Sequence, residues 1–291
     1  MSALADELKG DGVAVGTAAN ADTLGDGPVH GVGRVAVARH VGASTQHLAD
    51  QVIDEQPVAL VYNGVSHVVM MATPLDLEDF ALGFSLSEGL LTSLDELRDV
   101  EVQRAPLGVS VQLQVSPRAF ERFKDKRRQL AGRTGCGLCG IDSLEAFYES
   151  LPTGTVGAVG GSAQGWPTEA ISQAFRALPP LQALQAQTGG CHAAAWALPG
   201  QGIVLVREDV GRHNALDKLI GALAHEGALT PDGLALVSSR ASHEMVSKCV
   251  RAGIGVMAAI SAPTTLGIEL ARRSGLRLFG FCRGDSAVEY A

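Results

Sequence analysis

Residues 203–265 read IVLVREDVGRHNALDKLIGALAHEGALTPDGLALVSSRASHEMVSKCVRAGIGVMAAISAPTT, and no other part of the chain says as much about its architecture. Short apolar runs at 203–206, 234–237 and 254–260 alternate with segments whose apolar residues recur at helical spacing. A fourth apolar run follows at 276–281. This alternation predicts a β-α-β-α-β-α-β arrangement in an α/β fold, with a sheet flanked by helices.

Each of the four apolar runs is followed by a polar segment. If the strands are parallel, right-handed crossovers bring the segments that follow them to one edge of the sheet. We therefore expect four polar loops to converge at this edge. They are residues 207–213 (REDVGRH), 238–244 (SSRASHE), 261–265 (SAPTT) and 282–285 (CRGD).

The loop at 261–265 carries hydroxyl groups and free backbone N–H groups at a predicted helix start, an arrangement that can bind phosphate. Plain N-capping would explain the same residues. Because Ser261, Arg240 and Arg283 fall on the same predicted edge, we favour a site for a nucleotide or another phosphorylated ligand. The chain has no P-loop and no GxGxxG motif, so ATP or NAD use is not indicated.

The first half of the chain follows a different pattern. Strand-like runs at 58–62 and 65–71 flank Asn63-Gly64, a dipeptide typical of a tight hairpin turn. Thr73-Pro74 predicts the start of an amphipathic helix that ends at Gly89. The first half therefore reads as α+β.

A half-buried strand is predicted over 109–115, and Ser116-Pro117 opens a basic segment predicted to be helical. The first 32 residues are rich in Gly, Ala and Asp and have few large apolar side chains, which is typical of a mobile tail. The domain boundaries predicted from these patterns are a tail over 1–45, an α+β domain over 46–150 and an α/β domain over 151–291.

The sharpest local motif is GCGLCG at residues 135–140, in which glycines leave the thiols of Cys136 and Cys139 free of bulky neighbours. Nearby cations favour the thiolate, which is the reactive form. The sequence therefore predicts a reactive thiol at Cys136. The cations around it are Arg118, Arg122, Lys124, Lys126, Arg127, Arg128 and Arg133.

A zinc corner and a thioredoxin-like disulfide are the alternatives to a reactive thiol. Zinc needs four ligands, and Cys191-His192 is the only other plausible half-site, so no metal site is predicted. A thioredoxin-like motif should open a helix directly after a strand, which this pair does not do. Cys249 fits a small buried hydrophobe, whereas His192 and His213 lie in polar segments and are candidate binding residues.

Composition excludes several classes of protein. With 291 residues and 46% hydrophobic content, the chain can build one large or two ordinary cores. A net charge of -8 gives no overall basic field, so nucleic-acid binding is not expected. Neither a membrane span nor an export signal is recognisable, and five cysteines with one close pair suit reduced thiols, which predicts a cytoplasmic protein.

Several segments together resemble the formate dehydrogenase accessory sulfurtransferases, the FdhD family. The resemblance covers roughly residues 50–291, and REDVGRHNALDK is its most specific motif. The segments are VALVYNGVSHVVMMATPLDLEDFALGFSLSEG, GRTGCGLCGID, TGGCHAAAW, REDVGRHNALDKLIG, SSRASHEMVSKC and GLRLFGFCRGDSAVEY.

The resemblance implies a cytidine-deaminase-like core, a homodimer, and transfer of sulfur from a cysteine desulfurase to the molybdenum cofactor of formate dehydrogenase. That cofactor is a bis(molybdopterin guanine dinucleotide), of which GDP is a fragment. Carried over to this chain, the resemblance implies that Cys136 holds a persulfide and that Cys139 assists or resolves it. The segment implied to contact the guanine dinucleotide is Phe281, Cys282, Arg283, Gly284, Asp285 and Ser286.

Two features bear on these implications. Relatives carry Lys-Pro-Gly-Arg where this chain has Arg283-Gly-Asp-Ser286, so the role of a late arginine in phosphate contact does not carry over. The H-x-E and P-C-x-x-C signature of zinc deaminases is absent, which argues against deaminase activity. A cofactor chaperone whose cysteines carry no sulfur is the main alternative function, and a zinc-stabilised scaffold is a weaker one.

Overall fold

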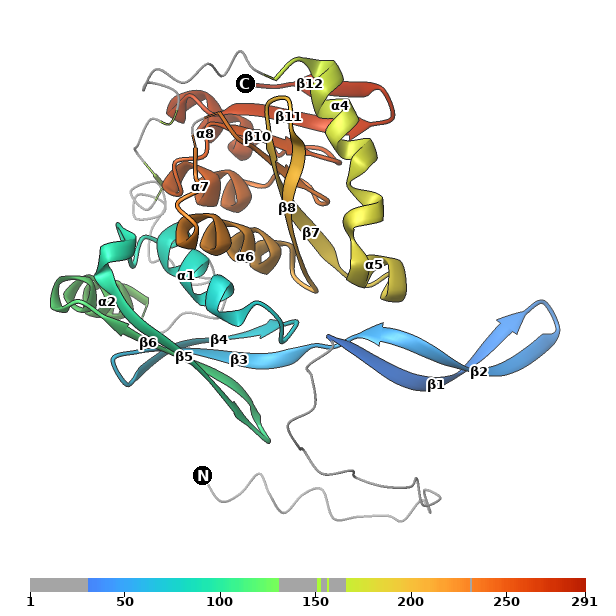
Figure 1. Ribbon diagram of the computed structural model, residues 1–291, viewed down its shortest axis with the longest axis horizontal. Coiled ribbons are helices and arrows are strands. Elements are labelled where there is room, and N and C mark those ends of the chain that lie inside the picture. The colour runs from blue at the N-terminus through green and yellow to red at the C-terminus, as the bar shows by residue number, and fades with distance from the viewer. Residues whose placement is uncertain (1–30, 131–150, 153–155, 157–165, 231) are drawn as a thin grey trace.

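The computed structural model describes residues 31–130, 151–152, 156, 166–230 and 232–291, with the side chains of 127–130 left out of the description. In this part of the chain a six-stranded sheet, a four-stranded sheet and a two-stranded ribbon combine with helices (Figure 1). The prediction of an α/β fold with an α+β N-terminal part is therefore confirmed. The cytidine-deaminase-like core stays a prediction.

The six-stranded sheet belongs to the C-terminal half and has the order β12-β11-β10-β9-β7-β8. β9, β10 and β11 are parallel neighbours, and β7 lies antiparallel between β9 and β8. β8 therefore points the same way as β9, β10 and β11, as the sequence predicted for these four strands. The bounds are β7 His192–Leu198, β8 Gly202–Asp209, β9 Leu234–Val237, β10 Val256–Ala259, β11 Arg277–Arg283 and β12 Ser286–Glu289.

Helices cover both faces of this sheet. Ala194 and Trp196 of β7 face α6, α7 and α8, whereas Ala193, Ala195 and Ala197 face α4. This alternation is the two-residue period of a strand buried on both sides. The bounds are α4 Thr168–Ala177, α5 Ala183–Thr188, α6 Arg212–His225, α7 His243–Arg251 and α8 Thr265–Ser274, with a 3-10 turn at Pro179–Leu181.

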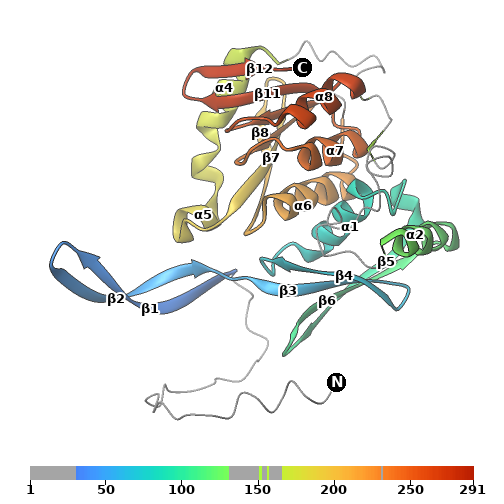
Figure 2. The same cartoon turned by 180° about the vertical axis from the view of Figure 1, so that it is seen from behind.

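The four-stranded sheet of the N-terminal half has the order β4-β3-β6-β5. The predicted hairpin is present, and Asn63 (φ 46°) and Gly64 (φ 80°) supply the two positive φ values that its tight turn requires. α1 lies between this sheet and α6 (Figures 1 and 2). The bounds are β3 Gln56–Tyr62, β4 Val65–Ala72, α1 Leu77–Ser87, β5 Leu97–Ala105, β6 Gly108–Val115 and α2 Pro117–Leu130, with a 3-10 turn at Leu94–Glu96.

The predicted start of α1 at Thr73-Pro74 is wrong. The helix begins at Leu77 after Asp76, which has left-handed backbone angles (φ 50°) and gives no side-chain cap. Thr73 is instead fully buried against β8, where its N–H donates to Asp209 Oδ2 and its Oγ1 accepts from the N–H of Val210. Thr73, which was predicted to cap the helix, therefore contacts a part of the chain that is distant in sequence.

Ordered structure also begins earlier than the sequence predicted. β1 (Val32–Val41) and β2 (Ser44–Ile53) form an antiparallel ribbon, so residues 32–45 are not part of a tail. The ribbon projects from the body beside α5 (Figures 1 and 2). Most of its side chains are exposed, and so it lacks the buried apolar face by which strands are recognised in a sequence. The remainder of the predicted tail, residues 1–30, lies outside the described residues.

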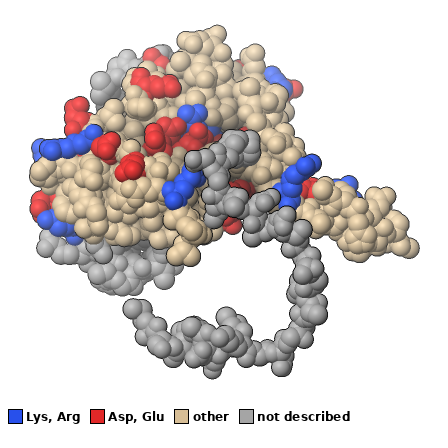
Figure 3. Space-filling model, turned by 60° about the horizontal axis from the view of Figure 1, so that its bottom comes forward, with Lys and Arg blue, Asp and Glu red and all other residues tan. Residues whose placement is uncertain are grey.

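The surface agrees with the acidic composition. On the face that Figure 3 shows, Lys and Arg side chains are scattered among Asp and Glu and form no broad basic field. No helix within the described ranges is long and apolar enough to cross a membrane.

Candidate functional site

The residues predicted to converge at the carboxyl edge of the sheet do so. Phe281 donates its N–H to the carbonyl of Ser261, and Arg283 Nε donates to the carbonyl of Ile260 at 2.8 Å. The loop that contains Arg240 is held against the loop after Ser261, because Ala241 forms a bridge with Pro263. The ends of β9, β10 and β11 thus share one edge.

β7 brings His192 to the same edge, because it runs against the other strands and starts where they end. The N–H of Ala193 donates to Ser238 Oγ at 2.8 Å, which fixes His192 beside the end of β9. His192 also lies within electrostatic range of His213 and Arg212 at the start of α6. Burial, followed by the positive charge of Arg212, lowers the pKa of His192. Its imidazole therefore favours the neutral form.

Three helices start at this edge: α6 after Gly211, α7 after Ser242 and α8 after Thr264. Helix N-termini carry partial positive charge and free N–H groups, so together they favour an anion. Arg240 and Arg283 are both exposed beside them. Thr264 Oγ1 accepts from the N–H of Gly267 at 3.2 Å, so one hydroxyl of the 261–265 loop is used for capping.

The closing segment, residues 281–286, contributes unequally to this edge. Phe281 is 44% exposed and has a φ of 50°, whereas Cys282 is fully buried on the face packed by α4. Burial raises the pKa of the Cys282 thiol to about 12. Arg176 of α4 pairs with Asp285 and donates to the carbonyl of Gly284, while Ser286 starts β12. Phe281 and Arg283 are therefore the side chains of this segment best placed to meet a ligand.

The REDVGRHNALDK motif does more than line the edge. Asp209 and Lys218 form a fully buried ion pair with 2.7 Å between Oδ2 and Nζ. Asp209 also accepts from Thr73 and Asn214, and Asn214 donates to the carbonyl of Met71. Much of this motif thus fastens the C-terminal half to the chain between β4 and α1.

The acidic and basic residues that open the motif have similar roles. Arg207 donates from Nε and Nη2 to Asp79 of α1, at 2.9 and 2.8 Å. Glu208 accepts from the N–H groups of Leu184 and Gln185 and so caps α5. Cys191 Sγ lies 3.3 Å from Glu208 Oε1. Burial and this carboxylate raise the pKa of the Cys191 thiol to about 12, which makes it a poor nucleophile.

A second buried cluster joins α1 to α7. Lys248 Nζ lies 3.0 Å from both carboxylate oxygens of Asp217, 2.8 Å from Glu88 Oε1 and 3.0 Å from Ser87 Oγ. Burial disfavours the ammonium, but the two carboxylates outweigh it and hold the pKa of Lys248 above its ordinary value. Because α1 ends here, its last carbonyls add to the attraction for cations.

Low pH should reduce the stability that this cluster gives to the fold, because it protonates Glu88. Burial raises the pKa of this carboxyl, but Lys248, Arg251 and Lys126 outweigh burial and lower it to about 2. A carboxyl with a lowered folded-state pKa stabilises the fold above its unfolded pKa and loses this contribution as pH falls towards 2. We expect Glu88→Gln to reduce the urea midpoint at pH 7 and the gap to the wild type to shrink between about pH 4.5 and 2. A gap that does not change with pH would contradict the ion pair.

α1 and α6 cross at a distance that only glycine permits. A Cβ on Gly83 would lie 1.7 Å from the carbonyl oxygen of Asp217, and one on Gly221 would lie 1.9 Å from that of Asp79. The helix backbones therefore touch directly. Together with the two ion clusters, this crossing fixes the N-terminal half to α6 and α7, two helices that start at the carboxyl edge.

Cys136 and Cys139 lie outside the described residues, as does Arg133. The predicted helix before them is present as α2, with Pro117 as its first residue and Ser116 Oγ accepting from the N–H of Ala119. Arg122 pairs with Glu96, and Lys126 donates to the carbonyl of Glu88. Two of the cations predicted to surround the thiols thus also anchor α2.

The prediction that Cys249 is a small buried hydrophobe is confirmed. Cys249 is fully buried beside Met257, with 3.7 Å between the sulfurs. His67 packs among the rings of Tyr62, Phe84 and Phe123.

Sequence reasoning missed two residues of the edge, His243 and Glu244. Glu244 in the first turn of α7 lies 3.8 Å from His213 Nε2 and 3.8 Å from His243 Nδ1. The segment SSRASHE already contained the signal, a histidine and a carboxylate at a helix start on the predicted edge.

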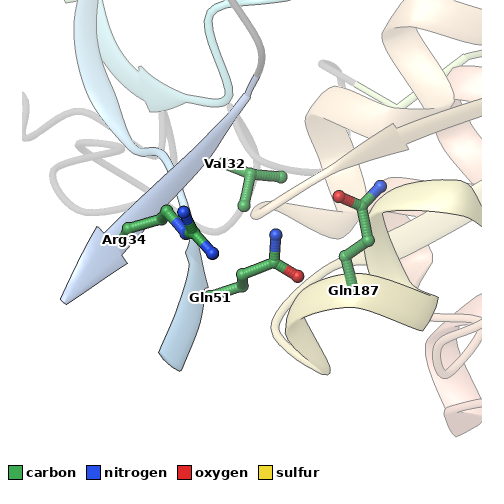
Figure 4. A pocket seen from close by; sticks show the side chains of 4 residues that line it. All are labelled: Val32, Arg34, Gln51 and Gln187. Carbon is green, nitrogen blue, oxygen red and sulfur yellow. The ribbon is translucent and has the colours of Figure 1, made fainter. Parts of the chain in front are cut away.

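A hollow elsewhere on the surface is not part of this edge. It lies at the root of the ribbon, where Val32, Arg34 and Gln51 approach Gln187 of α5 (Figure 4). None of the residues predicted as site residues lines it. The carboxyl edge therefore remains the candidate site.

The sequence model of the FdhD/NarQ family matches residues 53–291. A protein of Cupriavidus necator named "Sulfur carrier protein FdhD" is 53% identical over 242 residues, which cover 83% of this chain and 82% of that protein. A protein of Chromobacterium violaceum with the same name is 49% identical over 260 residues, covering 89% and 95%.

A solved structure is also similar. The crystal structure of a protein described as a formate dehydrogenase accessory protein, from Desulfotalea psychrophila, matches with a TM-score of 0.64 and 23% sequence identity. The match covers 89% of this chain and 96% of that one. At this identity the likeness bears on the fold alone.

Proposed function

Since this chain belongs to the FdhD/NarQ family, we propose that it is a sulfur carrier that serves the maturation of formate dehydrogenase. The names of its relatives support the carrier role, and both named proteins are about half identical to this chain over the matched residues. Within that role we assign the sulfur to Cys136, with Cys139 assisting. The donor is a cysteine desulfurase and the acceptor is the molybdenum cofactor.

The loading step is a thiolate exchange. The Cys136 thiolate attacks the outer sulfur of the desulfurase persulfide, the desulfurase thiolate leaves, and Cys136 becomes the persulfide. The rate depends on how much of the thiol is ionised, and cations favour ionisation. α2, which leads to the cysteines, carries the basic residues that supply this bias.

The delivery step needs the cofactor to be bound as a substrate. The observation that carries this half of the proposal is the convergence of Arg240, Ser261, Arg283, His192 and His213 on one edge, together with three helix N-termini. Arginines and helix N-termini suit phosphate, and an exposed Phe281 suits a base. This combination fits the guanine dinucleotide portion of a bis(molybdopterin guanine dinucleotide), of which GDP is a fragment.

Intact-mass measurement after incubation with a cysteine desulfurase and cysteine tests the carrier. We expect a gain of one sulfur atom that disappears on reduction and is absent in Cys136→Ala. Cys249→Ala is the matched control, because that buried thiol has a pKa raised to about 12 and should not load. Cys136→Ala should leave formate dehydrogenase inactive while still binding the cofactor.

The same variant separates the proposal from a non-catalytic chaperone. A chaperone would insert the cofactor without carrying sulfur, so Cys136→Ala would retain full formate dehydrogenase activity. That result would overturn the carrier role and leave the edge as a cofactor site. We further propose a homodimer located in the cytoplasm, which size-exclusion chromatography with light scattering and cell fractionation test.

A further inference from the structure

We propose that the ribbon formed by β1 and β2 is an arm through which this chain binds a second copy of itself. The inference rests on the homodimer of the proposed function and deepens it by naming the surface that forms it. α5 approaches the ribbon at its root (Figure 4). From there the ribbon extends away from the body of the described chain (Figures 1 and 2).

One face of the ribbon is largely apolar. Side chains two residues apart on a strand share a face, and so do residues directly opposite each other in an antiparallel pair. By this rule Val35 (40% exposed), Val41 (63%) and Val52 (39%) share one face. The half-buried Val37 and Leu48 pair with each other in the middle of the same face. The opposite face carries smaller or polar side chains, which are Arg34, Ala36, Ala38, His47, Ala49 and Gln51.

The ribbon has the properties of a surface that a partner covers. A two-stranded antiparallel ribbon is only marginally stable in water by itself, and each of its strands is also an edge with unpaired N–H and C=O groups. No third strand of the described chain pairs with β1 or β2. Each strand has 10 residues, so the ribbon alone approaches the about 20 to 30 residues that each partner gives to an interface of standard size.

The charges on the apolar face favour a second copy as the partner. Arg39 lies one pair beyond the Val37–Leu48 pair, and Asp50 lies one pair before it. Within the described ranges neither Arg39 nor Asp50 forms an ion pair. The face thus offers one cation and one carboxylate on opposite sides of its apolar centre.

Two-fold symmetry turns this arrangement into complementarity. In an isologous contact, a residue that meets a second one in the partner is met by that second residue in return. If two ribbons stack about a two-fold axis at the level of their Val37–Leu48 pairs, the level of Asp50 in one copy falls on the level of Arg39 in the other. The contact occurs twice. The face is therefore complementary to itself in apolar surface and in charge.

Charge reversal in the full chain tests the arm, with size-exclusion chromatography and light scattering over a dilution series as the measurement. We expect Arg39→Asp and Asp50→Arg each to raise the dissociation constant of the dimer at least about 10-fold, because each places like charges in both symmetric contacts. The double variant Arg39→Asp/Asp50→Arg restores opposite charges and should return the constant to within about threefold of the wild type. Arg34→Asp, on the opposite face of the ribbon, is the control and should leave the constant unchanged.

Three results would overturn the arm. Single variants that dimerise as well as the wild type would place the interface elsewhere and leave the proposed homodimer intact. Single variants that weaken the dimer without rescue by the double variant would exclude the self-complementary contact. A wild type that is monomeric at every concentration would remove the homodimer and the arm together, whereas the sulfur loading of Cys136 is judged separately by intact mass.

Hydrogen exchange of the wild type, followed by mass spectrometry, depends on no variant. Amide exchange within residues 32–53 should slow as the protein concentration rises through the dissociation constant, because docking stabilises a ribbon that otherwise opens easily. β5, an edge strand of the four-stranded sheet, is the control and should exchange at one rate throughout. Exchange in the ribbon that does not change while the chain dimerises would contradict the arm, even if the charge-reversed variants do not fold.

Discussion

Replacing Gly221 by alanine is expected to lower the free energy of unfolding by at least about 3 kcal/mol, because the new Cβ would meet the backbone of Asp79. Its distances to the Asp79 carbonyl oxygen and carbon would be 1.9 and 2.6 Å. Neither α1 nor α6 can rotate a backbone group away, so the helices must separate. For a chain of this size a loss of about 3 kcal/mol corresponds to a fall in melting temperature of about 5 °C.

The sign of this effect is informative. An alanine in place of glycine inside a helix normally stabilises by about 0.5 to 1 kcal/mol. Gly33→Ala on β1 is the control, since its Cβ would have 3.6 Å to the nearest side-chain atom. Thermal unfolding of the two variants should therefore differ clearly. A Gly221→Ala protein as stable as the wild type would mean that the helices do not cross this closely.

Lys248→Met should cost about 3 to 5 kcal/mol, because it leaves the Asp217 carboxylate buried without its cation. Asp217 is fully buried, and Lys248 is 7% exposed. Methionine keeps most of the volume of lysine, so the loss reports charge more than packing. Urea unfolding of the purified chain measures it.

An exposed ion pair on α2 serves as the control for this variant. Lys124 pairs with Glu121 on α2, with both side chains largely exposed, and such a pair contributes about 0.2 to 1 kcal/mol. Lys124→Met should therefore leave the urea midpoint nearly unchanged. Adding Asp217→Asn to Lys248→Met should recover part of the loss, because it removes the stranded charge. Equal losses in the two lysine variants would contradict a buried ion cluster.

The sequence predicted strands best where an apolar run contains large aliphatic side chains. β8, β9, β10 and β11 were all predicted, and their common direction followed from the handedness of crossovers. β7 was missed because HAAAWAL is mostly alanine, which has little preference for strands. It is a strand because tertiary packing needs small side chains on both of its faces.

The candidate site was predictable to the extent that it depends on topology. Arg240 and Ser261 follow two parallel strands and Arg283 ends a third, so the convergence of these residues could be expected from the sequence. Glu244 was missed because its place beside His213, 31 residues earlier, depends on where another helix starts. Likewise, the sequence could not separate the residues of REDVGRHNALDK that line the edge from those that fasten the two halves together.

The two ends of α7 make different contacts: its first turn lies at the carboxyl edge, and its last turn contacts the end of α1. Glu244 stands at one end, and Lys248 and Arg251 hold the last turn of α1 at the other, over a helix about 13 Å long. α2 is held at the same place through Lys126. Cys136 follows Leu130 by six residues, which span at most about 20 Å whatever their path. The sulfur chemistry proposed for Cys136 is therefore tied, by chain length alone, to the end of α2 that Lys126 holds.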